Sequence, residues 1–189
     1  MPKIVDSDQY RKELLYKCFD IFAEKGYGSV TTRQLAQEVG VSTGTLYHYF
    51  PSKAALFEQL VEELSKQDVL RVAAELEEAK TLKERLKVLG QILLKNEEYF
   101  IKQYFLWVDF CQRQDREELQ SSKVFQQINE RYQQAIADLL GITDSAIAWF
   151  IISHVDGIIL ERLWGNQNVS IVKQLELLGE MLVAYLEQH

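Results

Sequence analysis

The sequence contains few of the residues that interrupt helices. Of its 189 residues only 2 are proline and 9 are glycine, while 47% are hydrophobic and 26% are charged. This composition argues against disordered segments, linkers and β-sandwiches, and it favours packed helices. The length suits one compact body that carries a small additional module. We therefore predict an all-α fold.

Cysteine is scarce, and neither a secretory signal nor a membrane-spanning run is evident. The only cysteines, Cys18 and Cys111, lie far apart on predicted helices, so we expect free thiols. The start, MPKIVD, has no basic segment followed by an apolar one. The most apolar stretch, 146–155, ends at Asp156, short of the roughly 18 uncharged residues of a bilayer span. These features predict a cytoplasmic protein with no membrane partner.

The negative charge is unevenly distributed. The chain has a net charge of -7, yet the charges of residues 1–53 sum to +1, so the remaining residues carry -8. No acidic side chain occurs in residues 39–57. A surface built from this segment would not repel phosphate groups, whereas the acidic remainder would.

Capping signals divide the chain into about nine helices. Ser7 or Asp8 can cap a first helix that ends at Gly26, and Thr31 with Gln34 forms a capping box. Glycine and proline end several of the predicted helices. The further helices are predicted at 31–40, at 42–50, from 53 to about 78, from 81, at 115–140, from 143 or 144 to 164, and at 171–185.

Residues 31–53, TTRQLAQEVGVSTGTLYHYFPSK, satisfy the requirements of a helix-turn-helix. Ala36 is small enough for two helices to cross, and Gly40 permits the turn. A set of apolar residues fixes the angle between the helices: Leu35, Val39, Val41, Leu46 and Phe50. The short second helix then presents hydrogen-bonding side chains without negative charge, which suits a DNA major groove.

The stretches TTRQLAQEVGVSTGTLYHYF and PSKAAL closely resemble the DNA-binding module of the TetR family of bacterial regulators. The resemblance implies a DNA-binding domain at 1–52, an effector-binding and dimerisation domain at 53–189, and a homodimer on a near-palindromic operator. It implies phosphate contacts by Thr31, Thr32 and Lys53, and contacts to backbone and base edges by Tyr47 and His48. The predicted DNA-binding residues are Thr31, Thr32, Arg33, Ser42, Thr43, Gly44, Thr45, Tyr47, His48 and Lys53.

The later part of the chain is rich in aromatic residues and is similar in spacing to the effector domain of BetI-type members. Asp109 and Asp156 lie in apolar helical context, where a carboxylate needs a partner, either an ion pair or a ligand. For the aromatic residues, core packing is the alternative to lining a pocket. The predicted binding site for an unidentified small-molecule effector comprises Tyr104, Trp107, Asp109, Phe110, Phe125, Tyr132 and His154.

Apolar residues cover more than one stripe of the predicted helix at 147–163, so this helix must bury two faces. We expect one of them to pack against a second copy of the chain. The predicted dimer interface comprises Ile152, Val155, Ile159, Leu163, Leu178, Met181 and Leu182. No arrangement of residues indicates a metal site, a cofactor or a catalytic centre.

Together these features predict a ligand-responsive repressor that a small, partly apolar effector releases from operator DNA. An activator is the alternative, because the position of the operator decides between the two. A helical carrier of ligands or lipids without DNA-binding activity and an α-helical enzyme are the competing classes. The outward face of residues 42–48 argues against the carrier, and the absence of a nucleophile with a base argues against the enzyme.

Overall fold

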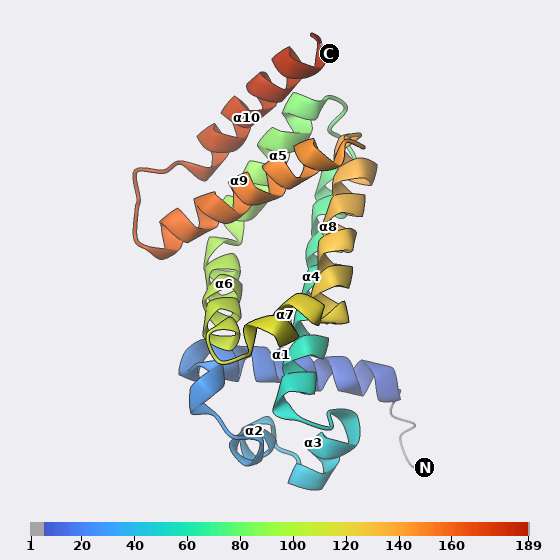
Figure 1. Ribbon diagram of the computed structural model, residues 1–189, viewed down its shortest axis with the longest axis vertical. Helices are drawn as coiled ribbons and strands as arrows, with labels where there is room; N and C mark the ends of the chain where they lie inside the picture. Colours follow the sequence, from blue (N-terminus) through green and yellow to red (C-terminus); the bar gives the residue numbers. More distant parts are fainter. Residues whose placement is uncertain (1–5, 189) are drawn as a thin grey trace. The chain divides into compact units, whose positions relative to one another are not determined.

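The computed structural model describes residues 6–188, and this part of the chain contains ten α-helices, one 3-10 turn and no strand (Figure 1). The predicted all-α fold is therefore confirmed. The elements are α1 (Ser7–Lys25), η1 (Tyr27–Ser29), α2 (Thr32–Val39), α3 (Thr43–Tyr49), α4 (Lys53–Leu76), α5 (Leu82–Lys95), α6 (Glu97–Cys111), α7 (Arg116–Ser121), α8 (Lys123–Leu140), α9 (Ser145–Leu163) and α10 (Ile171–Leu186).

The chain forms two compact units that do not follow a single cut in the sequence. Unit 1 contains residues 6–64 and Phe105–Gln126, and unit 2 contains Ser65–Tyr104 and 127–188. As a result α4, α6 and α8 each contribute residues to both units. The boundary predicted after residue 52 divides the chain by function, and it stays a prediction.

The core of unit 1 is apolar and rich in aromatic residues. On α1, residues at three- and four-residue steps face inward, and Phe22 at the end of this stripe is fully buried. Gly26 then ends α1 with φ +82°, a conformation that glycine adopts without steric cost. The side chains that close the core from α2, α3 and α4 are Leu35, Leu46, Phe50, Leu56 and Phe57.

In unit 2, α5 and α10 lie side by side (Figure 1). Two glycines allow their close approach. A Cβ at Gly90 would lie 3.1 Å from the Cα of Val172, and one at Gly179 would lie 3.4 Å from the Cα of Lys83. The inner faces of both helices join a core to which α9 contributes Ile151, Ile158 and Ile159.

Two predicted helix boundaries are wrong. The first helix is capped by Asp6, whose carboxylate accepts from the amides of Asp8 and Gln9, and not by Ser7 or Asp8. The helix expected at 115–140 is two helices, because Ser122 adopts an extended conformation with φ -64° and ψ 117° between α7 and α8. The serine pair at 121–122 is a weak local signal for this break, since serine favours helix caps and turns.

No single helix among residues 6–188 combines the length and the apolar composition that a bilayer crossing requires. By length and composition alone, α8 and α9 meet that test only as a pair, with a bend of 102° between them.

Candidate functional site

The segment from Thr31 to Tyr49 forms two short helices joined by a tight turn. Thr31 caps α2, since its hydroxyl accepts from the Gln34 amide at 3.3 Å and the Gln34 side chain accepts from the Thr31 amide at 2.9 Å. Gly40 ends α2 in the left-handed region with φ +80°. Ser42 caps α3 by accepting from the Thr45 amide at 2.9 Å.

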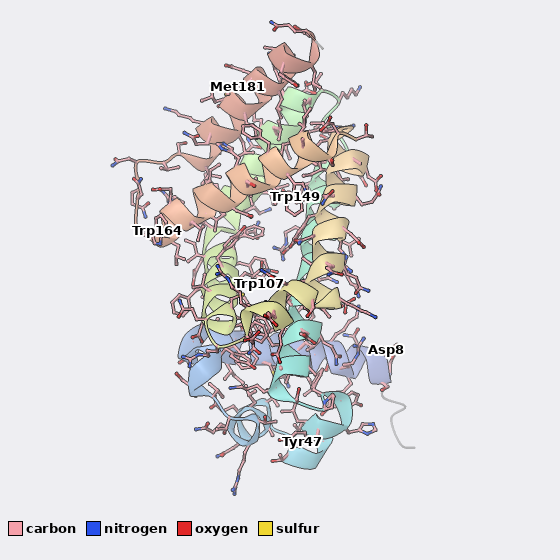
Figure 2. All side chains as sticks on the ribbon, in the orientation of Figure 1. Asp8, Tyr47, Trp107, Trp149, Trp164 and Met181 are labelled. Atoms are coloured by element: carbon pink, nitrogen blue, oxygen red, sulfur yellow. The ribbon has the colours of Figure 1, made fainter. Side chains whose placement is uncertain are left out.

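The outer face of α3 is accessible and carries no carboxylate. Leu46 points into the core, whereas Tyr47, 49% exposed, and His48 point away from it. Figure 2 marks Tyr47 on this helix. Gly44 is exposed and Thr43 is half-buried, so hydroxyl, imidazole and phenol groups share one surface. Such groups can donate to phosphate oxygens and pair with base edges.

Lys53 supports the segment that leads into α2. Its ammonium donates to the carbonyls of Tyr27 and Val30, both at 2.9 Å, and lies 4.2 Å from the centre of the Tyr27 ring. Burial lowers the pKa of Lys53, and the charge of Arg113 lowers it further, while Asp109 opposes both effects. Lys53 therefore stabilises the loop before α2, in addition to the phosphate contact that the sequence predicts for it.

Four of the residues predicted to bind the effector lie in unit 1 and have structural partners there. Phe110 is buried and stacks on Phe57 at 3.8 Å between ring centres, and Trp107 lies 4.9 Å from the Phe125 ring (Figure 2 labels Trp107). These contacts agree with the alternative that the aromatic side chains pack in a core.

Asp109 likewise has a partner in unit 1, in the turn that follows α1. Its carboxylate accepts from the Gly28 amide and from Nε of Arg113, each at 3.0 Å. Burial alone would raise the pKa of Asp109, but these hydrogen bonds and the guanidinium charge outweigh burial and hold the pKa below its ordinary value. Asp109 thus holds η1 in place, and the effector role predicted for it stays a prediction.

A cavity of about 180 Å³ lies within unit 2 between α4, α5, α6, α8 and α9. Its wall is mostly apolar, with Phe100, Leu89 and Ile159 among the lining residues. Two predicted effector residues, Tyr104 and Tyr132, line it. His154, also predicted, is not among the lining residues; it lies on α9, where its ring stacks on Phe150.

The polar part of this cavity contains two carboxylates. Asp68 accepts from the Tyr99 hydroxyl at 3.0 Å and from Nε2 of Gln103 at 3.1 Å, and Arg71 lies 3.7 Å from it. Burial raises the pKa of Asp68, although these hydrogen bonds and the Arg71 charge oppose the rise. Asp68 and Gln103 were not among the predicted site residues, because their hydrogen bond joins positions 35 residues apart in the sequence.

Asp156 is the second carboxylate, and the sequence already marked it as needing a partner. The Tyr104 hydroxyl donates a hydrogen bond to it. Burial raises the pKa of Asp156, and only the Tyr104 hydrogen bond opposes that rise. The pKa of the Tyr104 hydroxyl is raised as well, first by burial and then by the Asp156 charge.

The residues predicted for the dimer interface divide into inner and outer ones. Ile159, Leu178 and Leu182 are at most 5% exposed and belong to the core, and Ile152, Val155 and Ile159 line the cavity. These side chains have contacts within the protomer, and their role in a dimer interface stays a prediction. Leu163 is half-buried, and Met181 on α10 is 54% exposed.

Large apolar side chains are exposed along α9 and α10, and we call the two sets the exposed stripes of these helices. Trp149 and Trp164 lie near the two ends of α9, and Met181 lies on α10 (Figure 2). Gly157 on α9 has open space beyond its Cα. The exposed large apolar residues of the two helices are Trp149, Phe150, Trp164, Leu177, Met181, Tyr185 and Leu186. Patches of this kind mark interaction surfaces.

Comparison with known families identifies the first region. Residues 12–60 match the model of bacterial regulatory proteins of the tetR family. Among characterised proteins, the nucleoid occlusion factor SlmA of Vibrio vulnificus is 43% identical over 70 residues, which are 37% of this chain and 36% of that protein. SlmA of Shewanella pealeana is 39% identical over 85 residues, 44% of this chain and 43% of that protein. The chain thus matches less than half the length of these relatives.

Solved structures share the fold over nearly the whole chain. One is the transcriptional regulator FadR from Bacillus subtilis, in complex with stearoyl-CoA. It matches with a TM-score of 0.68 at 21% sequence identity, and the match covers 91% of this chain and 97% of the FadR chain. A regulator from Rhodococcus has a TM-score of 0.72 at 19% identity, covering 92% and 96%. A proposed regulator from Saccharomonospora viridis, in complex with choline, has a TM-score of 0.67 at 18% identity, covering 93% and 96%.

Proposed function

Residues 12–60 belong to the TetR family of bacterial regulatory proteins, the chain has the fold of solved transcriptional regulators, and from this premise we propose a ligand-responsive repressor that binds operator DNA as a homodimer. Residues 1–52 form the DNA-binding part, and residues 53–189 form the effector and dimerisation part. The protein acts in the cytosol, where bacterial DNA lies, and its role requires no catalytic group.

The observation that carries the proposal is the outer face of α3, which is accessible and lacks carboxylates. In a major groove, Tyr47 and His48 would meet backbone and base edges, and Thr43 would approach the bases. The N-terminus of α2 would meet phosphate through Thr32 and the exposed Arg33. Lys53 keeps a third N–H for a phosphate beside the two that bind carbonyls.

The exposed stripes of α9 and α10 support a homodimer. They leave large apolar side chains in water in a single protomer, and a second copy would bury them. A twofold axis would present two α3 helices to one side of a duplex, and successive major grooves require them to lie about 34 to 36 Å apart. The operator is therefore a near-palindrome.

The cavity of unit 2 is proposed as the effector site. Solved regulators of this fold hold stearoyl-CoA in one case and choline in another. In this chain, α4 and α6 line the cavity and also contribute residues to unit 1. An effector that binds one arrangement of these helices better than another would shift the population away from the DNA-binding state. A coupling of about 1 to 3 kcal/mol gives a 5- to 150-fold response.

Selection of duplexes from a random pool tests the DNA-binding proposal. We expect near-palindromic sequences, with affinity that falls as salt increases. Tyr47→Ala and His48→Glu should each weaken binding by roughly 5- to 150-fold, because each removes or repels a contact worth about 1 to 3 kcal/mol. Gln120→Glu, which changes the charge equally on the exposed face of α7, is the matched control.

The result that contradicts the proposal is a protein that binds no duplex at low ionic strength. If such a protein still bound small molecules in unit 2, the helical ligand carrier would be the better description. Loss of the dimer in Tyr47→Ala would instead assign Tyr47 to packing.

A further inference from the structure

We propose that the cavity of unit 2 takes a small hydrophobic monocation, an ammonium group carrying an aromatic or short alkyl body. This inference rests on the proposed role of the cavity as the effector site and specifies the chemical class of the effector. Three properties of the cavity support it: its volume, the sign of its charge, and the incomplete pairing of one carboxylate.

The volume restricts the size of the occupant. An apolar cavity of about 150 Å³ holds benzene. The cavity here, at about 180 Å³, therefore suits a ring with a short substituent and is too small for a long acyl chain. Apolar residues form most of the wall, so the body of the occupant is apolar as well.

The charge of the wall is negative. Two of the lining residues are aspartates, Asp68 and Asp156, and the described lining residues include no lysine, arginine or histidine. Arg71 lies behind Asp68, outside the cavity wall, and balances that carboxylate. Among the described lining residues, no cationic side chain is therefore available to pair with Asp156, and a monocation would supply that pairing.

Asp156 is the group that this cation would pair with. The carboxylate of Asp68 already accepts from Tyr99 and Gln103, whereas the one hydrogen bond to Asp156 from the described residues comes from Tyr104. An ionised carboxylate offers about four lone-pair sites, so Asp156 can accept further hydrogen bonds from an ammonium group. Its position at the cavity wall places those sites next to the apolar body of the occupant.

Other classes of ligand fit less well. A carboxylate or phosphate would bring a second negative charge beside Asp156 in a partly desolvated site, which is unfavourable. A neutral apolar molecule would remove water from Asp156 without replacing its hydrogen bonds. A neutral hydroxyl could donate to Asp156, but a cation donates a charge-assisted hydrogen bond and also neutralises the carboxylate.

Calorimetric titration of the purified protein with three matched probes tests the inference. The probes are 2-phenylethylammonium, 2-phenylethanol and phenylacetate, which share a phenyl ring and a two-carbon chain but carry positive, zero and negative charge. We expect the ammonium to bind at least roughly 10-fold more tightly than the alcohol, as charge-assisted hydrogen bonds allow. Phenylacetate should bind more weakly than either.

Asp156→Asn assigns the preference to one residue. The amide keeps the shape and can still accept from Tyr104, so the ammonium should lose its roughly 10-fold advantage over the alcohol. Asp138→Asn is the matched control, since Asp138 is exposed on α8 and does not line the cavity. The control should keep the advantage. The wild-type protein by itself shows whether the ammonium binds more tightly than the alcohol, so the inference can be tested even if Asp156→Asn fails to fold.

Equal binding of ammonium and alcohol, tighter binding of phenylacetate, or no binding of the ammonium would each overturn the inference. The outcome is independent of DNA. If the ammonium binds as expected but no duplex binds, the proposed regulatory function fails while the ligand class stands. If duplexes are bound and the ammonium is not, the ligand class fails and the regulator stands.

Discussion

Replacing Asp109 by alanine separates the two roles that this residue can have. In the structure its carboxylate accepts from the Gly28 amide and from Arg113, both at 3.0 Å, and so holds the turn between α1 and α2. We expect Asp109→Ala to destabilise unit 1 and to weaken DNA binding without any effector present. A residue that contacted the effector would alter the response to it instead.

The expected magnitude follows from the two contacts. Leaving the partly buried Gly28 amide unpaired costs about 1 to 3 kcal/mol. The ion pair with Arg113 adds roughly 0 to 1 kcal/mol, because the arginine side chain is 51% exposed and water screens it. A total near 2 kcal/mol lowers the melting temperature by about 4 to 8 °C for a chain of this length.

The pH dependence of the loss has a defined sign. The pKa of Asp109 is held below its ordinary value of 3.8, so the carboxylate stabilises the folded state above that pH. As the pH falls through the lowered folded-state pKa, the contribution disappears. The difference between wild type and Asp109→Ala should therefore be full at neutral pH and shrink in acid.

Thermal unfolding and amide hydrogen exchange measure these effects. Faster exchange at the Gly28 amide in Asp109→Ala would report the opened turn directly. Asp109→Asn is the control, because its amide oxygen can still accept from Gly28 and only the charge is lost. Unchanged melting and unchanged exchange in the alanine variant, together with an altered effector response, would refute the structural role.

The remaining predictions concern packing, assembly and the buried carboxylate. Gly90→Ala should lower the melting temperature, because overpacking against the α10 backbone, at about 1 to 3 kcal/mol, exceeds the gain in helix propensity of about 1 kcal/mol. Gly157→Ala, which meets no neighbour within the protomer, should raise the stability of the protomer. Met181→Glu should weaken the dimer at least about 10-fold in sedimentation experiments, and an unchanged dimer would place the interface elsewhere. Because burial raises the pKa of Asp156, its ionisation costs stability as pH rises through the folded-state value; Asp156→Asn should remove this decline in melts between about pH 4 and about pH 8.

Sequence reasoning predicted the fold class and located the helix pair α2–α3, because the signals there are local. The capping box of Thr31 and the left-handed turn at Gly40 each depend on residues within a few positions of one another. The roles in DNA binding that the sequence predicted for this segment stay predictions.

The effector site was predicted less well because α6 contributes to both units. Tyr104 and Trp107 lie three residues apart, yet Tyr104 lines the cavity of unit 2 and Trp107 packs in unit 1. No periodicity within one helix reveals where its surroundings change. Asp68 was missed for a related reason, since its partners Tyr99 and Gln103 come from a distant helix.

The interface residues stay a prediction, because apolar residues cover more than one face of α9. Its inner residues, such as Ile159, and its outer residues, such as Trp149, have similar hydrophobicity in the sequence. Such a pattern indicates that two faces of the helix are buried. It does not indicate which face packs against the core of the same chain and which packs against a partner.

Under the proposed function, the lack of carboxylates at α3 affects how the protein searches the chromosome. The chain has a net charge of -7, so a duplex that meets its acidic remainder is repelled. Encounters in the wrong orientation are short-lived, and residence on arbitrary sequences stays brief. Selectivity thus begins with which side of the molecule a duplex can touch at all, before any base is read.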